Sequence, residues 1–259
     1  MPPISIHALA GIGLATKISN PKLKVLLVFG AVLPDCDLLV SVGIYLLTGD
    51  LDLGKIFHRT ITHSLIIHLI LFSIGLGILQ FGRRQYGALL MIIAIGMAVH
   101  TSLDFAYIAY MTHEDAQNNI EPGIALFWPL TDEKFAIWEF EVSDRIYNIL
   151  IATDFLSDPL LYFLPLLWLA FKRETDSEFL KPLVIISVID AIIMMGFTLL
   201  AIFGSLSPDD FIFYSYIPGV FDVILALIFP FLLRDTIGTV EWGQPWLSPF
   251  WEVQIGPEA

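Results

Sequence analysis

The sequence predicts an all-α fold: a polytopic integral membrane helical bundle of about six spans, preceded by a short N-terminal helix. Three observations lead to this prediction. Hydrophobic residues make up 56% of the 259-residue chain, its mean hydropathy is +0.77, and only 15% of its residues are charged. A soluble core does not need so much apolar sequence, and the apolar residues gather in runs of roughly 20, which fit the thickness of a bilayer.

The expected elements run from a short helix to a polar tail. The apolar stretch from Ile4 to Ile18 is too short to cross a bilayer unaided, so we expect a short helix there. The next segment has the length of a span but is interrupted by Pro34. The expected spans are Val25 to Leu47, Ile61 to Phe81, Tyr86 to Met111, Ile146 to Phe171, Leu183 to Phe203 and Phe211 to Leu233.

The distribution of basic residues predicts the orientation of the spans. Lys22, Lys24, Arg83 and Arg84 lie in the turns of the first two expected hairpins, and the positive-inside rule assigns such turns to the cytoplasm. The loop from Thr112 to Asp144 then faces the other side of the membrane. Because this loop is long for a connector, acidic and aromatic, we expect a lid or a substrate-facing element there.

Charge and cysteine content exclude several function classes. With a formal net charge of −13 and no visible basic patch, the chain is a poor nucleic-acid binder, so we expect no nucleic-acid partner. The single cysteine, Cys36, excludes an intrachain disulfide and a zinc site of the Cys-x-x-Cys type. The N-terminus lacks the basic region of a cleavable signal peptide, so we expect the first helix to belong to the mature protein.

Ionisable residues within the apolar segments point to a functional site. The stretch from Phe57 to Leu65 places His58, Arg59 and His63 at the start of the second expected span. Imidazole is a common metal ligand and guanidinium a two-pronged partner for phosphate, so this stretch carries both halves of a metal-assisted phosphoester site. The further candidates at helical distances are His7, Asp35, Asp37, His100 and Asp104.

Two predicted hairpins bring these residues to a similar depth. With a turn near Pro21, His7 and Asp35 lie about equally far from that turn. His63 and Asp104 are likewise about equally far from the basic turn of the second hairpin. We therefore predict that four side chains converge closely enough to share one metal ion: Asp35, His63, His100 and Asp104.

One feature of the spacing opposes a single cluster. Asp35 and Asp37 would point to nearly opposite faces of an ideal helix. A break at Pro34 offers a way out, because both aspartates then line a pocket from irregular backbone, which is tolerated at membrane depth where protein or water surrounds it.

Each polar residue also has a plainer reading, since ionisable groups in spans can simply pair with one another and hold helices together. His68 is expected to pack between helices, and His113 to be a solvated loop residue. For Asp190 and Asp222 we expect interhelical hydrogen bonding. Two residues of the expected span from Ile146 to Phe171 are candidates to border the site: Asp154 and Asp158.

The ordered motifs resemble a known family. They are His7 with Gly11, Leu33 to Asp37, His58 to Ser64, Gly96 to Asp104, and Gly123 to Pro129. Together they resemble the YdjM-like group of LexA-binding, inner-membrane-associated, metal-dependent hydrolases and, more distantly, the zinc-dependent phospholipase C group. The resemblance covers about the first half of the chain. The stretch between Asp104 and Gly123 is longer than that family's usual connection.

The resemblance implies a site, a cofactor and a location. It implies a divalent metal, zinc by preference, and an integral protein of the inner cell membrane. Asp37, His58 and Arg59 are the expected catalytic residues, with Arg59 holding the phosphate. The residues implied as metal ligands are His7, Asp35, Asp37, His58, His63, His100 and Asp104, of which His58 is the one we assign to catalysis instead.

These expectations combine into one function with two rivals. The first is a metal-dependent hydrolase that acts on a phosphoester in a lipid or lipid-linked substrate, carried by residues 1–145, with residues 146–259 forming a C-terminal membrane-spanning half. The second is a transporter or ion-conducting protein, for which Asp190 and Asp222 speak. The third is a non-catalytic membrane scaffold. A hydrolase predicts one polar cluster, whereas a transporter predicts polar residues spread through the bilayer.

Overall fold

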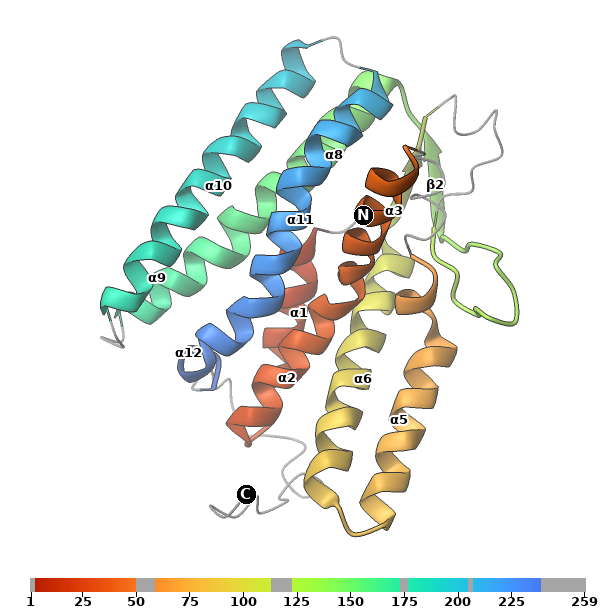
Figure 1. The fold of residues 1–259 in the computed structure, drawn as a ribbon, viewed down its shortest axis with the longest axis vertical. Helices are drawn as coiled ribbons and strands as arrows, with labels where there is room; N and C mark the ends of the chain where they lie inside the picture. Colours follow the sequence, from red (N-terminus) through yellow and green to blue (C-terminus); the bar gives the residue numbers. More distant parts are fainter. Residues whose placement is uncertain (1–2, 50–58, 113–122, 173–176, 205–206, 239–259) are drawn as a thin grey trace.

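The computed structural model describes residues 3–49, 59–112, 123–172, 177–204 and 207–238, and these residues are mostly helical (Figure 1). The first half contains α1 (Ile4–Ala15), α2 (Pro21–Val32), α3 (Asp37–Thr48), α5 (Leu65–Gln80) and α6 (Arg84–Ala106). The second half contains α8 (Asp144–Asp158), α9 (Leu164–Lys172), α10 (Ser177–Phe203), α11 (Pro208–Leu232) and α12 (Arg234–Gly238). The predicted predominantly helical fold is confirmed.

Two short strands depart from the all-α prediction. β1 (Ile108–Met111) and β2 (Trp138–Glu141) pair in parallel, with Ile108 opposite Trp138. The long connection between α6 and α8 makes this pairing possible, because parallel strands cannot be joined by a tight turn. β2 therefore belongs to the loop predicted to be substrate-facing. β1 instead occupies the last residues of the expected span Tyr86 to Met111, whose helix α6 ends at Ala106.

Among the described residues, four helices are long and apolar enough to cross a membrane: Pro21–Thr48, Arg84–Ala106, Asp144–Phe171 and Leu180–Phe203. Shorter apolar helices cover Ile4–Ala15, Leu65–Gln80 and Pro218–Leu232. The expected span at Ile61 to Phe81 is shortened because Ile61–His63 form a 3-10 turn and α5 starts only at Leu65. The helix lengths therefore support four candidate spans, and a count of six goes beyond them.

The first span is broken where proline interrupts the sequence. α2 begins with Pro21 after Asn20, whose side chain accepts hydrogen bonds from the backbone of Lys22 and Leu23. It ends at a 3-10 turn, Leu33–Cys36, which contains Pro34. α3 then starts at Asp37, so the two aspartates lie on either side of a change in backbone geometry, as expected from Pro34.

Helices α1, α2, α5 and α6 pack closely beside one another in the first half (Figure 1). A methyl group added at Gly96 of α6 would lie only 2.5 Å from the carbonyl oxygen of Leu27 in α2. A methyl group added at Gly30 of α2 would likewise lie 2.5 Å from the carbonyl oxygen of Ile93 in α6. Glycine at both positions therefore lets α2 and α6 approach closely, which brings His100 next to Ala31.

One hydrophobic core joins the two halves of the chain. Ile4 and Ala8 of α1 belong to the same buried cluster as Tyr162, Phe163 and Phe229 of the C-terminal helices. Helix α1 lies beside α8. A π-helical turn at Pro159–Phe163 continues α8 and also contacts α1. The element that carries His7 is therefore packed against the second half as well as against α2.

Candidate metal centre

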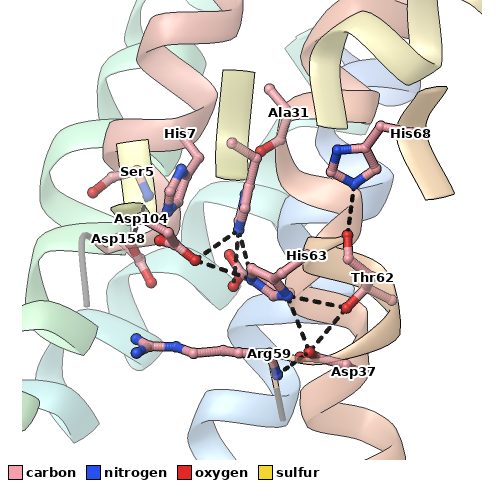
Figure 2. A network of polar contacts seen from close by, with 12 residues as sticks. Ser5, His7, Ala31, Asp37, Arg59, Thr62, His63, His68, Asp104 and Asp158 are labelled. Atoms are coloured by element: carbon pink, nitrogen blue, oxygen red, sulfur yellow. Dashed lines mark hydrogen bonds and ion pairs between the residues drawn. The ribbon is translucent and has the colours of Figure 1, made fainter. Parts of the chain in front are cut away.

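Five predicted site residues converge inside the bundle (Figure 2). All are buried: their exposed fractions are 9% or less, and those of the three histidines are 0%. They form two groups whose potential ligand atoms lie within 4.8 Å of one another: His7, His100 and Asp104; and Asp35, His63 and His100. The convergence predicted from matched depth in the two hairpins is confirmed as geometry.

The distances within the cluster are those expected between ligands of one ion. The Nε2 atoms of His63 and His100 are 3.1 Å apart, and Asp104 Oδ2 lies 3.0 Å and 3.4 Å from them. Asp35 Oδ1 lies 3.5 Å from His100 Nε2. Two atoms bound to a tetrahedral zinc ion at about 2.0–2.2 Å are roughly 3.3–3.6 Å apart. Within each of the two groups, the side chains therefore need little movement to share an ion.

Hydrogen bonds on the far side of each ring turn the lone pairs inward. His100 Nδ1 lies 2.8 Å from the carbonyl oxygen of Ala31, which can only accept, so His100 donates from Nδ1. His63 Nδ1 lies 3.2 Å from Asp37 Oδ2, a carboxylate acceptor, so it too carries a hydrogen. In their neutral forms both rings then present Nε2 lone pairs to each other. Such a contact is repulsive unless a cation lies between them.

Two buried polar atoms in this cluster have neither a hydrogen bond nor an ion pair among the described residues: His7 Nδ1 and Asp35 Oδ2. His7 stacks on His100 with ring centroids 3.7 Å apart, and its Nε2 is 3.1 Å from Asp104 Oδ1. Buried polar atoms are nearly always satisfied in folded proteins. Imidazole and carboxylate together suit a divalent metal such as zinc, so the residues present fit that cofactor.

The centre has more negative charge than its histidines offset. His63 lies in the turn before α5, outside the apolar helix. Burial alone would lower the pKa of His63, but the carboxylates of Asp37 and Asp104 outweigh it and raise the pKa to about 10. Without a metal ion, His63 is therefore protonated and its Nε2–H faces Asp104 and His100; a bound divalent cation would displace this proton.

Asp37 takes a different place from that of a metal ligand. Its Oδ2 accepts hydrogen bonds from the Arg59 backbone N–H at 2.7 Å and from the Thr62 hydroxyl at 2.9 Å, and it faces His63 Nδ1. Neither group of potential ligand atoms includes it. The change from the 3-10 turn to α3 turns its carboxylate to the outer side of His63. Asp37 thus lies behind His63, whereas the sequence suggested a place for it among the potential ligand atoms.

Arg59 is held in an unusual backbone conformation. Its φ is +65°, in the left-handed region that non-glycine residues rarely adopt. Its N–H donates to Asp37, and its carbonyl accepts from the N–H of Ala125 at 3.0 Å. In Figure 2 its side chain runs below Asp104 on the side of Asp158, and its buried Nε has no hydrogen-bond partner in the part of the chain described. His58 lies outside the described residues.

Comparison with known proteins agrees with this picture. The sequence model of the YdjM inner membrane protein family matches residues 1–200. The chain belongs to this family. No curated protein and no solved structure matches it. The match reaches beyond the first half that the motifs cover, so residues of α8 and α10 belong to the shared family pattern. As a YdjM family member, the protein is an integral protein of the inner membrane.

The motif from Gly123 to Pro129 is hydrogen-bonded to the segment that carries His63. The Ser64 hydroxyl donates to the carbonyl oxygen of Trp128 at 2.5 Å, and the N–H of Leu65 donates to that of Leu126 at 3.0 Å. Ser64 also accepts from the N–H of Ile67 and so begins α5. In this YdjM family member, the part of the long loop after residue 122 is thus hydrogen-bonded to the chain directly after His63, where α5 begins.

The sequence analysis missed two groups that contact the candidate site residues, and it correctly expected His68 to be a packing residue. It missed Thr62, which bonds to Asp37, and the backbone carbonyl of Ala31, which fixes His100. Only the first left a signal in the sequence, as a hydroxyl next to a candidate ligand. His68 packs near the site and its Nε2 lies 2.9 Å from the carbonyl oxygen of Thr62, as expected for a packing histidine.

The remaining acidic candidates lie on the C-terminal helices. Asp158 is 1% exposed and contacts Ser5, beside the site. Asp190 and Asp222 are 2% and 0% exposed and interact with each other between α10 and α11. His113 lies outside the described residues.

Proposed function

We propose that this YdjM family member is a membrane-embedded, metal-dependent hydrolase of a phosphoester in a lipid or lipid-linked substrate. The observation that carries the proposal is the pair of Nε2 atoms of His63 and His100, 3.1 Å apart with both Nδ1 atoms engaged by acceptors. Two carboxylates approach the same point. Such a set binds a divalent cation in preference to any other class of ligand.

The proposed ligands are His63, His100, Asp35 and Asp104, with His7 beside Asp104 Oδ1 as a further member of the centre. A bound zinc ion lowers the pKa of a coordinated water toward about 7 and polarises a phosphoryl oxygen. Asp104 presents one oxygen to His7 and the other to His63 and His100, so it ties the members of the centre together.

The other residues of the chain have positioning and binding roles. Asp37 holds His63 in the tautomer that leaves Nε2 free, as a carboxylate commonly does behind a metal-bound histidine. Asp35 Oδ2, buried and without a partner in the described part of the chain, is suited to accept the proton of an attacking water. Asp37 is less suited to that role because its Oδ2 already receives two hydrogen bonds and faces His63.

Arg59 is the proposed phosphate-binding residue. Asp37 and Ala125 fix its backbone from two sides, and its side chain passes below Asp104 (Figure 2). A guanidinium offers several donors in one plane and matches two phosphate oxygens at once. Strained backbone at a position held by its neighbours is frequent at ligand-binding residues. These observations support a phosphorylated substrate.

The surroundings of the centre support a lipid or lipid-linked substrate. The centre lies where α2 meets α3 and near the ends of α5 and α6 that are remote from their turn (Figure 1). We further propose six crossings, in which α5 and α11 join the four longer spans, with the basic turns on the cytoplasmic side. A substrate with an apolar tail can then reach the centre from the bilayer.

The transporter alternative rests on one specific observation. Asp190 and Asp222 are buried together between α10 and α11, at a distance along the chain from the metal centre. A cation path would use such a pair. Hydrolysis without ion flux in proteoliposomes supports the hydrolase, and ion flux without hydrolysis supports the transporter. Bound metal with neither activity favours a scaffold.

Metal content and turnover of matched variants test the proposal. The protein is purified in detergent as wild type, His63→Ala and His68→Ala, and each is analysed for zinc and other divalent metals. His68 is the control because it is a buried histidine of the same segment with its Nε2 on a backbone carbonyl. We expect metal in wild type and His68→Ala and little in His63→Ala. Hydrolysis of bis(4-nitrophenyl) phosphate and of phospholipid in micelles should follow the metal. A wild-type protein that binds no divalent metal contradicts the proposal.

A further inference from the structure

The first turn of α1 has a buried backbone donor that its own sequence cannot satisfy. The N-cap residue is Pro3, which offers no side-chain hydrogen bond. Ile6 donates to the carbonyl of Pro3, but the N–H of Ser5, a residue with 0% exposure, has no local acceptor. Helix starts usually solve this with a Ser, Thr, Asp or Asn at the N-cap. Here the acceptor must come from elsewhere in the fold.

Asp158, the last residue of α8, supplies it. Its Oδ1 accepts the Ser5 N–H at 2.7 Å across a separation of 153 residues, and its exposed fraction is 1%. Next to it, the hydroxyls of Ser5 and Ser157 are 3.0 Å apart. A carboxylate at a helix N-terminus also interacts favourably with the helix dipole, and the more so away from water. Asp158 therefore performs the work of an N-cap from the other half of the chain.

The contact lies two residues before His7. Figure 2 shows Ser5 and Asp158 immediately beside His7 and Asp104. His7 contacts its neighbours through a ring stacked on His100 at 3.7 Å and through Nε2, 3.1 Å from Asp104 Oδ1. No acceptor among the described residues lies behind the ring at His7 Nδ1. His100 and His63, in contrast, are each oriented by an acceptor behind the ring. The orientation of His7 must therefore come from the placement of α1.

We infer that Asp158 is a positioning residue for the metal centre: by capping α1 it holds the His7 imidazole against Asp104 and His100. The inference rests on the proposed metal centre with His7 as a member. It gives the C-terminal half a part in the site through Asp158, a residue that the sequence analysis expected only to border it. The shared core of Ile4 and Ala8 with Tyr162 and Phe163 seats α1, and the Asp158 bond fixes its end.

A double-mutant cycle tests the inference through zinc affinity, measured by competition with a chromophoric chelator. Asp158→Ala should weaken zinc binding about 10- to 100-fold, as loss of an orienting group behind a ligand commonly does. In a His7→Ala background the same change should have less than a twofold effect, because Asp158 acts through His7. An undiminished loss in that background would mean that Asp158 binds the metal itself or acts generally, and would overturn the inference. So would a less than twofold effect in the wild-type background.

Controls separate positioning from general damage. Ser157→Ala removes the hydroxyl contact with Ser5 but keeps both the Ser5 N–H and the Asp158 carboxylate, so it should bind zinc like wild type. Asp190→Asn alters a buried acid of α10 that interacts with Asp222, and it too should leave affinity unchanged. If Asp158→Ala does not fold, the cycle is run with Asp158→Leu, which fills the space of the carboxylate but offers no acceptor. A threefold or greater loss is then expected, and equal affinity overturns the inference.

A readout without metal completes the test. In the metal-free protein, hydrogen exchange of a peptide covering α1 should be faster in Asp158→Ala than in wild type and unchanged in Ser157→Ala. Unchanged exchange in Asp158→Ala contradicts the capping role. The two proposals fail in different ways. A wild-type protein without zinc affinity contradicts the metal centre. Normal zinc affinity in wild type that is unchanged in Asp158→Ala contradicts this inference alone.

Discussion

The Nε2 atoms of His63 and His100 face each other at 3.1 Å, while the Nδ1 atom of each ring is turned toward a group that accepts hydrogen bonds. His63 is the last residue of a 3-10 turn and His100 lies in α6, so two separate elements create this contact. Two neutral imidazoles in this arrangement repel each other. A cation between them removes the repulsion, and Asp35 and Asp104 supply the compensating charge.

Removing the carboxylate behind His63 should weaken metal binding. Asp37→Asn keeps the size of the side chain but loses the charge that faces His63 Nδ1, so we expect a fall of about 10- to 100-fold in zinc affinity. Asp132→Asn, at an exposed position, is the control and should have no effect. Competition with a chelator measures both. Unchanged affinity in Asp37→Asn would show that this contact does not orient the ligand.

Arg59 should matter for substrate more than for metal. Arg59→Lys keeps the positive charge but loses the planar fork of donors, so we expect normal zinc content and a loss of kcat/KM of about 100-fold, or roughly 2.7 kcal/mol. Arg83→Lys, in the exposed turn before α6, is the control. Activity within a factor of two of wild type rules out a phosphate-binding role. Loss of zinc in Arg59→Lys instead makes Arg59 a residue that orients ligands.

Depth and spacing were predictable, whereas the fine geometry was not. The sequence indicated that Asp35, His63, His100 and Asp104 lie at one level, since distance from a hairpin turn can be counted along a helix. It also indicated the break at Pro34. It could not assign Asp37 to the outer side of His63, because that depends on where a 3-10 turn gives way to α3.

Contacts that depend on backbone atoms or on distant segments left no sequence pattern. The carbonyl of Ala31 orients His100, yet any residue at position 31 has a carbonyl. Asp158 reaches Ser5 only because α1 and α8 lie beside each other in the folded chain. The pairing of β1 with β2 likewise depends on how the long loop returns to the bundle.

The close approach of α2 and α6 gives a prediction about packing. In Gly96→Ala the new methyl group would lie 2.5 Å from the Leu27 carbonyl oxygen, so α6 must move away from α2. We expect destabilisation of about 1–3 kcal/mol and weaker zinc binding, because His100 moves away from Ala31. Gly77→Ala is the matched control, with nothing within 4 Å of the added methyl group, and should be neutral or slightly stabilising. Thermal unfolding in detergent measures both; equal midpoints contradict the prediction.

Orientation in the membrane can be tested with single cysteines in a Cys36→Ser background. We expect a cysteine in place of Glu133, within the long loop, to react with an impermeant maleimide in intact cells. A cysteine in place of Gln85, in the first turn of α6 beside the basic turn, should react only after the membrane is opened. The opposite pattern would reverse the proposed topology.

Metal should also stabilise the fold. A ligand that binds only the folded protein adds about 4 kcal/mol at a concentration 1,000 times its Kd. We therefore expect the Tm to fall when a chelator removes the metal, and to be restored by added zinc. His63→Ala should lack this zinc-dependent change, and His68→Ala should retain it. A Tm of the wild-type protein that ignores both chelator and zinc contradicts the prediction.

X-ray absorption at the zinc edge of the zinc-loaded protein tests the central claim most directly. The account predicts nitrogen and oxygen ligands at about 2.0–2.2 Å, with the outer-shell scattering of at least two imidazoles. That imidazole signal should weaken in His63→Ala and in His100→Ala and persist in His68→Ala. A zinc ion surrounded by oxygen alone, without imidazole scattering in the wild-type protein, would contradict a metal centre at these residues.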